Sequence, residues 1–402
     1  TIIYETMLTL YEKHQPIDFL SVSSKLKEAE ALEDVGGRSY LTQLVESVPT
    51  SAHINHYAKI VKEKKVLRDL INASAEISET AFKETNDLET LLDDVEQKIF
   101  SISQQSIPQT FVHIKEELNV AYERIERLAR GERPIRGLST GFPELDGILS
   151  GIQNSNLIVV GARPSLGKTS FALDIARHIA TKEEKPVGIF SLEMSREEIV
   201  DRMIAAESNV PLWRLRTGRI TDETDFTLIQ TALDALSRAP IYIHDMPTSN
   251  IMQIRSIARR LQSQHGLSAL IVDYLQLIQP RTNSDNVVQQ ITEISRGLKA
   301  LARELNIPVI ALSQLSRNVE QREIKIPRLA DLRDSGSIEQ DSDVVIFLYR
   351  KDRDKLHPTS EEENLAEIIV AKHRNGPLGT IKLKFDQDKV SFRSLDTRHL
   401  DN

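Results

Sequence analysis

The stretch Leu157–Ala172 constrains the fold of this chain more than any other. Its first four residues, Leu157–Val160, form a short continuous apolar run, which is typical of a parallel strand covered on both faces. The run is followed by Gly-Ala-Arg-Pro-Ser-Leu-Gly-Lys-Thr and then by Ser-Phe-Ala, which indicates a tight turn and a helix start. The sequence therefore predicts a buried strand, a loop and a helix in direct succession.

The loop is typical of a phosphate-binding loop that ends in Gly167-Lys168-Thr169. In such loops backbone N–H groups surround phosphates, the lysine reaches the terminal phosphates and the Thr hydroxyl binds Mg²⁺. The strict pattern has Gly at the position of Ala162, but a small residue still permits the turn. A chance Gly-Lys-Thr on a surface loop is the alternative, and the strand before it and helix after it argue against that. The predicted nucleotide-binding residues here are Gly161, Ala162, Arg163, Pro164, Ser165, Gly167, Lys168, Thr169 and Ser170.

Composition favours a globular protein of two or three domains. The 402 residues are 40% hydrophobic and 27% charged, and no apolar run approaches the roughly 20 residues that span a bilayer, so we expect no membrane partner. The absence of cysteine excludes disulfides, thiolate catalysis and Cys-based zinc sites, and it suits a reducing cytoplasm. Because the net charge is −8, we expect any contact with nucleic acid to be local, in loops or a channel.

Residues 1–105 are predicted to be almost wholly helical, since apolar residues recur there at helical spacing. His14, His53 and His56 do not have the spacing of a metal site, and we interpret them as surface or packing histidines. Nothing in this part indicates catalysis, so we predict a small helical assembly domain. The expected helices include Ile3–Leu10, Leu20–Leu26, Tyr40–Val45, Ile54–Ile71 and Leu88–Ile102.

Residues 106–133 are interpreted as a linker that contains one amphipathic helix. The polar segment around Pro108 begins it, and a helix over about 112–130 ends before Gly131. A lone amphipathic helix must bury its apolar stripe on its own chain or on a neighbouring subunit, and periodicity alone leaves both open. The stripe consists of Ile114, Leu118, Tyr122, Ile125 and Leu128.

Residues 134–402 are predicted to form an α/β domain with a mostly parallel sheet flanked by helices. Short apolar runs alternate there with helical segments, which is the pattern of such a sheet. Ligands bind at the carboxyl ends of its strands, so the residues directly after each run are the candidates for function. The expected strands are Leu157–Val160, Val187–Leu192, Ile241–His244, Leu270–Val272, Val309–Leu312, Val344–Leu348 and Ile368–Val370.

Three of these strand ends carry polar residues suited to ATP hydrolysis. Glu193 follows the second run and can orient and deprotonate a water, although its position also allows it to cap the helix near Ser195. Asp273 ends an apolar strand in the Walker B pattern and is expected to support Mg²⁺ opposite Thr169. Gln314 ends the fifth run and is a candidate sensor of the γ-phosphate.

Other polar segments are candidates for contacts with nucleic acid and with a neighbouring subunit. The loops within 279–290 and 317–343 are polar and partly basic, which suits backbone contacts to a single strand, with plain solvated loops as the alternative. Lys372 and Arg374 precede a Gly-Pro turn and can reach together toward a phosphate held by a neighbouring subunit. The alternative for this pair is a cationic hairpin edge that prevents strand aggregation.

Seven motifs in order make the chain resemble the DnaB-type replicative DNA helicases of bacteria and their phages, which have a RecA-like motor. The resemblance covers essentially the whole chain, and few unrelated proteins would carry the full set. The motifs are Gly137–Asp146, Gly161–Thr169, Phe190–Ser195, Val272–Ile278, Ala311–Arg317, Asp334–Asp341 and Lys372–Gly376.

This resemblance implies a homohexameric ring with ATP at the subunit interfaces, which moves 5′ to 3′ on single-stranded DNA and unwinds forked DNA. It also implies a primase and a helicase loader as partners. Residues 1–105 correspond to an N-terminal collar, truncated at its start, and 134–402 to the ATPase motor. The helix at 112–130 corresponds to a linker helix that docks on the adjacent motor, which favours the neighbour as its binding surface.

The resemblance also assigns roles to single residues. Arg202 is expected to pack on the nucleotide base, and Lys372 and Arg374 to act in trans on the neighbour's ATP. Because Asp334 is acidic, backbone amides are the expected donors in the DNA-backbone loop. That loop consists of Arg333, Asp334, Ser335 and Gly336. The roles of Lys168, Thr169, Asp273, Glu193 and Gln314 agree with those predicted above from their positions.

Two other functions compete with a helicase. A recombinase or branch-migration ATPase of the RecA or RadA type shares the same core, but RadA-type chains usually carry a Cys-based zinc module that this chain lacks. An assembly scaffold that uses nucleotide only as a switch would not need the water-activating Glu193.

Overall fold

The computed structural model describes residues 2–47, 54–83, 114–130, 137–220, 222–280, 287–332, 336–353 and 363–395, and positions 91, 95, 98, 99 and 102. The chain divides into two compact units, Thr1–Glu116 and Glu117–Asn402, and each is described by itself. Most of the helix predicted over 88–102 lies outside the described residues. Within the described ranges every helix is too short or too polar to cross a membrane.

The first unit is helical where the sequence predicts it. A small core of Leu10, Val22, Leu26, Leu32 and Leu41 joins its first three helices. The side chain of Asp18 caps the second of them by accepting a 2.7 Å hydrogen bond from the backbone N–H of Ser21. The helices are α1 (Ile2–Glu12), α2 (Phe19–Glu28), α3 (Gly37–Glu46) and α4 (Ile54–Phe82).

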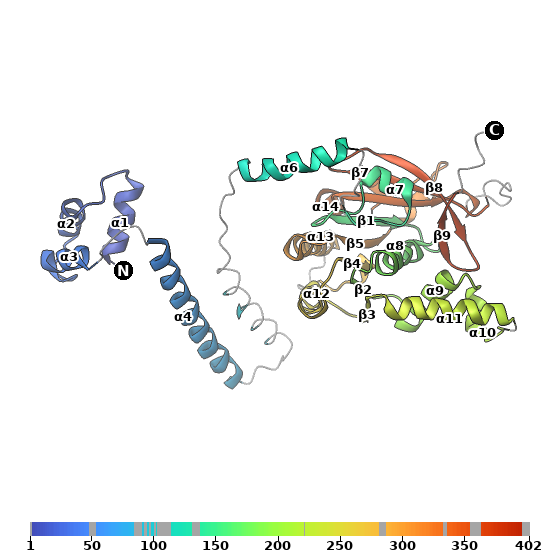
Figure 1. Ribbon diagram of the computed structural model, residues 1–402, viewed down its shortest axis with the longest axis horizontal. Helices are drawn as coiled ribbons and strands as arrows, with labels where there is room; N and C mark the ends of the chain where they lie inside the picture. The colour runs from blue at the N-terminus through green and yellow to red at the C-terminus, as the bar shows by residue number, and fades with distance from the viewer. Residues whose placement is uncertain are drawn as a thin grey trace. The chain divides into compact units, whose positions relative to one another are not determined.

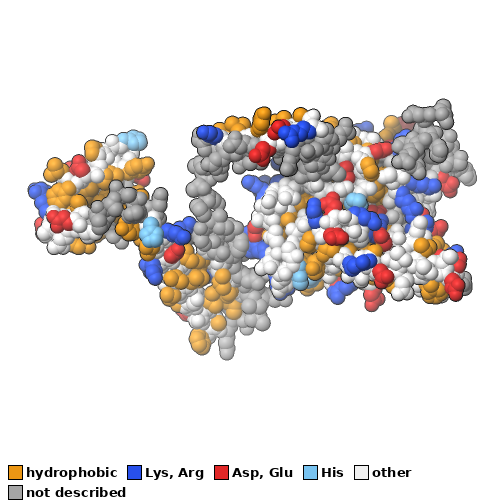
Figure 2. Space-filling view, in the orientation of Figure 1, with side chains coloured by type: hydrophobic (Ala, Val, Ile, Leu, Met, Phe, Trp, Pro, Cys, Tyr) orange, Lys and Arg blue, Asp and Glu red, His pale blue; other side chains and the backbone are white. Residues whose placement is uncertain are grey.

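Helix α6 (Ile114–Ala129) lies where the sequence predicts the amphipathic helix. Four side chains of its apolar stripe, Ile114, Leu118, Tyr122 and Ile125, are 56–69% exposed in the single chain. Figure 2 shows hydrophobic side chains gathered along this helix. The stripe is therefore available to a further surface.

The second unit is built on a nine-stranded sheet in the order β3-β2-β4-β5-β1-β6-β7-β8-β9. Strands β1 to β6 pair in parallel, whereas β7, β8 and β9 are antiparallel additions at one edge. The strands are β1 (Leu157–Ala162), β2 (Val187–Ser191), β3 (Ile241–Asp245), β4 (Ala269–Asp273), β5 (Val309–Gln314), β6 (Val344–Arg350), β7 (Leu365–His373), β8 (Gly379–Asp386) and β9 (Ser391–Ser394).

Helices cover both faces of the parallel part of the sheet. Alternate residues of β1 explain this arrangement, because Ile158 and Val160 belong to the hydrophobic core that includes residues of α8 and α9, while Leu157 and Val159 belong to the core that includes residues of α12 and α13. Figure 1 shows these two pairs of helices on opposite sides of the strands. The helices are α7 (Pro143–Leu149), α8 (Lys168–Lys182), α9 (Arg196–Ser208), α10 (Leu212–Thr217), α11 (Glu223–Arg238), α12 (Ile251–His265), α13 (Val287–Leu305) and α14 (Gly336–Asp341).

The predicted α/β class with a mostly parallel sheet and a helical N-terminal part is confirmed. All seven predicted strands are present, and their ends lie within three residues of the expected bounds. Strands β8 and β9 were not predicted. In β8 only alternate residues are buried, and β9 is four residues long, so neither forms the continuous apolar run that marks the buried strands.

A candidate nucleotide site at the strand ends

A pocket of about 310 Å³ opens at the carboxyl ends of β1, β2, β4 and β5. This is the edge at which ligands bind in parallel α/β sheets. It brings together predicted residues that are far apart in the sequence. The pocket is lined by Ala162, Arg163, Pro164, Ser165, Gly167, Lys168, Thr169, Glu193, Met194, Arg202, Tyr274 and Gln314.

The loop between β1 and α8 is shaped by Gly167. This residue has φ +95°, and a Cβ there would lie 2.9 Å from Cζ of Phe392 on β9. Only glycine fits this turn without strain or displacement of the aromatic ring. Helix α8 begins at the next residue, Lys168, so its first free N–H groups and its positive end lie at the pocket. That arrangement suits the binding of phosphate.

The ammonium group of Lys168 lies deep in the pocket. Its Nζ is 3.6 Å from Oδ1 of Asp273 and 4.2 Å from the ring centroid of Tyr274. Burial lowers the pKa of Lys168, and the charges of Asp273 and Glu193 oppose that shift. A bound phosphate would add negative charge beside this buried cation and favour its charged form.

Thr169 and Asp273 form the second part of the site. Thr169 Oγ1 donates a 2.6 Å hydrogen bond to Oδ2 of Asp273, which is 3% exposed. A hydroxyl and a carboxylate are hard oxygen ligands, the donor set that Mg²⁺ prefers. The residues therefore fit a magnesium ion beside the phosphate-binding loop.

Glu193 is exposed at the mouth of the pocket, two residues after the end of β2. The alternative that it caps α9 is wrong, because Ser195 and Glu198 form a reciprocal capping box there with hydrogen bonds of 3.3 Å and 3.2 Å. Its negative charge acts on both Lys168 and Arg202 across the pocket. Glu193 is therefore placed near the phosphate-binding groups without a role in the helix cap.

Gln314 ends β5 and lines the pocket. Its backbone is held by Gln276, a residue that the sequence analysis did not single out. Gln276 Nε2 donates to the carbonyl of Gln314 at 3.1 Å and to Ser313 Oγ at 3.0 Å, and its Oε1 accepts from the N–H of Gln314 at 3.2 Å. An amide side chain three residues after the Walker B aspartate was the signal that could have identified it.

Two arginines at the rim of the pocket differ in their hydrogen bonding. Arg163 donates to Oε1 of Glu320 at 2.8 Å and to the carbonyl of Leu315 at 2.8 Å, so its guanidinium is engaged by its own chain. Nε of Arg202 is buried and has no hydrogen-bond partner within the part of the chain that the structure describes. Burial, followed by the charge of Arg216, lowers the pKa of Arg202. An orphaned donor at this position fits a polar ligand in the pocket.

The two remaining residues of the predicted loop set lie slightly further in. Gly161 belongs to β1, where a Cβ would lie 2.9 Å from the ring of Phe347, so close strand packing accounts for this glycine. Ser170 is 2% exposed in the first turn of α8. Tyr274, in contrast, was not predicted, yet it lines the pocket beneath the Lys168 ammonium because it directly follows Asp273.

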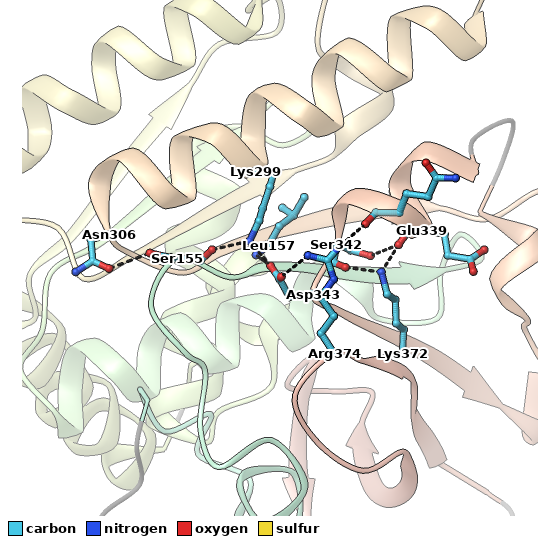
Figure 3. Close-up of polar contacts among 10 residues, drawn as sticks. Ser155, Leu157, Lys299, Asn306, Glu339, Ser342, Asp343, Lys372 and Arg374 are labelled. Atoms are coloured by element: carbon cyan, nitrogen blue, oxygen red, sulfur yellow. Dashed lines mark hydrogen bonds and ion pairs between the residues drawn. The ribbon is translucent and has the colours of Figure 1, made fainter. Parts of the chain in front are cut away.

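Lys372 and Arg374 lie on and just after β7, away from the pocket lining. Lys372 Nζ donates to the carbonyls of Glu339 and Ser342, the latter at 2.6 Å, and Arg374 Nη2 donates to the carbonyl of Gln340 at 2.8 Å (Figure 3). Burial, followed by the charge of Arg374, lowers the pKa of Lys372. The two cations therefore lie together at the carboxyl end of α14, where they contact carbonyls of their own chain.

The predicted DNA-backbone loop is only partly visible. Arg333, Asp334 and Ser335 lie outside the described residues, as does the segment 281–286 in the loop after β4. Gly336 is exposed and is the first residue of α14. Figure 2 shows acidic and basic side chains interspersed on the visible face of the second unit, in keeping with the modest net charge of −8.

Comparisons with known proteins agree over nearly the whole chain. A family model described as the DnaB-like helicase C terminal domain matches residues 137–394, and one described as the DnaB-like helicase N terminal domain matches residues 1–63. The replicative DNA helicase DnaB of Geobacillus stearothermophilus is 47% identical over 397 residues, which cover 98% of this chain and 87% of the relative. The replicative DNA helicase DnaC of Bacillus subtilis (strain 168) has the same identity and coverage.

Two solved structures are also similar. One is described as "The Structure Of A DnaB-Like Replicative Helicase And Its Interactions With Primase"; it has a TM-score of 0.76 and 34% identity, and the match covers 98% of this chain and 91% of the other. The other, described as an ATPase domain, has a TM-score of 0.67 and 38% identity, and the match covers 71% of this chain and 100% of the other. The resemblance predicted from the seven motifs is confirmed. The chain belongs to the family of DnaB-like replicative DNA helicases.

Proposed function

We propose that this replicative helicase hydrolyses ATP in the pocket at the strand ends and uses the energy to move 5′ to 3′ along single-stranded DNA, unwinding the duplex at a fork. The contact between Thr169 and Asp273, beside the buried Lys168, carries this proposal. It joins the two defining parts of a P-loop ATPase, a phosphate-binding loop and a strand-end carboxylate, at one point.

Within this pocket each residue has a separate task. Lys168 and the first N–H groups of α8 hold the phosphates of ATP, and Gln314 contacts the γ-phosphate. Thr169 and Asp273 hold Mg²⁺, which neutralises phosphate charge when bound. Glu193 orients a water molecule and accepts its proton during attack on the γ-phosphate.

The assembly proposed for this motor is a homohexameric ring. The exposed stripe on α6 supports a docking surface on an adjacent motor, since an apolar stripe of this length is costly to leave in water. Lys372 and Arg374 lie outside their own pocket, which supports a role in trans as cations that face the ATP of the neighbouring subunit.

The two family matches, over residues 1–63 and 137–394, support the proposed division of labour. Residues 1–105 form the collar, 106–133 the linker with its docking helix, and 134–402 the motor. The segment Arg333–Gly336 contacts the DNA backbone through its amides. A primase and a helicase loader are the proposed protein partners, the first supported by the relative whose description names interactions with primase.

Strand separation on two forked DNAs tests the proposal. One fork carries only a 5′ single-stranded tail for loading and the other only a 3′ tail, and ATP with Mg²⁺ is added to both. Unwinding confined to the 5′-tailed fork is the expected result. If neither fork opens while single-stranded DNA still stimulates ATP hydrolysis, either a missing loader or a recombinase or branch-migration ATPase of the RecA or RadA type becomes the better explanation.

A further inference from the structure

Asp343 is a buried carboxylate between α14 and β6 that the mechanism above does not use. It is 5% exposed, and its two oxygens face different partners (Figure 3). Oδ2 accepts hydrogen bonds from Lys299 Nζ at 2.6 Å and from the N–H of Leu157 at 2.8 Å. Oδ1 lies 3.4 Å from Nη1 of Arg374. One oxygen is therefore fixed by the interior of the fold, and the other is directed at a predicted functional cation.

The backbone around Asp343 reinforces this arrangement. Its N–H donates to the carbonyl of Leu157 at 2.9 Å, and its carbonyl accepts from the N–H of Arg374 at 2.9 Å. Arg374 is thus held by Asp343 through both the main chain and the side chain. Since Leu157 begins β1, the strand that leads into the phosphate-binding loop, Asp343 also ties Arg374 to the central strand of the motor.

The Arg374 guanidinium remains available to a further anion. Its side chain is 52% exposed, although Nη2 donates to the carbonyl of Gln340 and Nη1 faces Asp343. A guanidinium has more N–H donors than these two contacts use. Fixing a long side chain in advance reduces the entropy lost when it binds a phosphate, and a planar guanidinium gains most from such fixing.

We propose that Asp343 is a positioning residue for Arg374: anchored by its side-chain and main-chain hydrogen bonds to Leu157, it holds the guanidinium where it meets the ATP of the neighbouring subunit. The inference rests on the proposed role of Arg374 in trans. Asp343 itself contacts no nucleotide. Its effect is on the placement of the cation, so its loss slows hydrolysis more than it weakens ATP binding.

The first test compares two substitutions in the same ion pair. Asp343→Asn removes the charge that faces Arg374, whereas Lys299→Gln removes the charge on the other side and leaves the Asp343 carboxylate and its contact with Leu157. In the full chain with single-stranded DNA, we expect D343N to lower kcat about tenfold with KM for ATP within about twofold. K299Q is expected to lower the melting temperature at least as much as D343N and to keep kcat within about twofold. An equal loss of kcat in both variants would show that Asp343 acts only through stability.

The second test uses mixed rings and separates Asp343 from the proposed function. Glu193→Gln subunits keep Arg374, and Arg374→Ala subunits keep Glu193. In a mixed ring, Arg374 of a Glu193→Gln subunit can face the pocket of an Arg374→Ala subunit, and that interface then has both residues. The mixture should therefore hydrolyse more ATP than the sum of the two separate proteins. We expect D343N to regain activity in the same way when mixed with E193Q and to regain none when mixed with R374A. A gain with R374A overturns the positioning role. No gain in the reference mixture of E193Q and R374A overturns the trans role of Arg374 itself.

Discussion

Thr169 and Asp273 are 104 residues apart in the sequence, yet Oγ1 of the first donates a 2.6 Å hydrogen bond to Oδ2 of the second. Thr169 follows β1 at the start of α8 and Asp273 ends β4, and these two strands are not neighbours, because β5 lies between them. The contact therefore depends on the order of strands in the sheet. It places a hydroxyl and a carboxylate where one metal ion can reach both.

Loss of the Thr169 hydroxyl or of the Asp273 carboxylate charge should strongly reduce magnesium-dependent turnover. Thr169→Ala and Asp273→Asn are each expected to lower kcat about a hundredfold or more, since transition-state charge is then poorly neutralised. Chelation of the metal should have the same effect on the unaltered protein. Thr181→Ala is the matched control, because Thr181 lies on the same helix and its hydroxyl bonds only the carbonyl of Arg177 among the described residues. Equal Mg²⁺ dependence of T169A and T181A would contradict the assignment.

Glu193→Gln should separate binding from chemistry. The amide cannot accept the proton of the attacking water, so turnover should fall by a factor of about 100 to 10,000 while ATP binding is retained. Steady-state hydrolysis and binding of a fluorescent ATP analogue measure the two effects. Glu198→Gln is the control, because glutamine preserves the capping box with Ser195 and should leave turnover unchanged. Normal turnover in E193Q would remove Glu193 from the mechanism.

Gln276→Ala should impair Gln314 without touching the nucleotide. The substitution removes three hydrogen bonds that hold Ser313 and the backbone of Gln314. The backbone that carries the sensor side chain is then no longer held in place. We expect kcat about tenfold lower, with ATP affinity within about twofold. The control is Gln262→Ala, which removes a comparable 2.8 Å bond from an amide to the carbonyl of Leu305. A similar kcat in the two variants would argue against the role of Gln276.

The affinity for ATP should weaken at alkaline pH through Lys168. Burial lowers the pKa of this lysine in the free protein, and the phosphates of bound ATP should raise it again. Binding is then strongest below the free-state pKa, where the ammonium is already charged, and weakens as pH rises above it because binding must take up a proton. Calorimetry in buffers of different ionisation enthalpy measures that proton. Lys168→Met should bind weakly at every pH without proton uptake from this site.

Asp174 should matter for the stability of the site. It is 5% exposed on α8 and accepts hydrogen bonds from Ser391 Oγ at 2.9 Å and from the N–H of Phe392 at 2.7 Å, which fixes the ring beside Gly167. Asp174→Ala leaves both donors unsatisfied, so the free energy of unfolding should fall by roughly 2 to 4 kcal/mol. Chemical denaturation measures the change. The exposed Asp234→Ala on α11 should change it by less than about 0.5 kcal/mol.

The parts of the fold that were predicted share one physical property. Strands β1, β2, β4, β5 and β6 are buried on both faces or nearly so, and they appear in the sequence as continuous apolar runs. Strand β8 has one exposed face, so buried and exposed residues alternate along it. This alternation was not distinguished from a loop in the sequence. Asp273, Glu193 and Gln314 were identified because each lies at the end of such a run.

The sequence by itself therefore determined which residues lie at the strand ends, because each strand, loop and helix forms from residues that are neighbours along the chain. Tertiary structure decided which of those ends meet. Strands β4, β5 and β1 are consecutive in the sheet, so the ends of β4 and β1 lie close enough for Asp273 to contact Thr169. Strand β9 likewise places Phe392 against Gly167. Gln276 and Asp343 gain their partners only through such long-range pairing. Their contacts depend on the order and register of strands, which the cooperative burial of the whole sheet selects and no local pattern encodes.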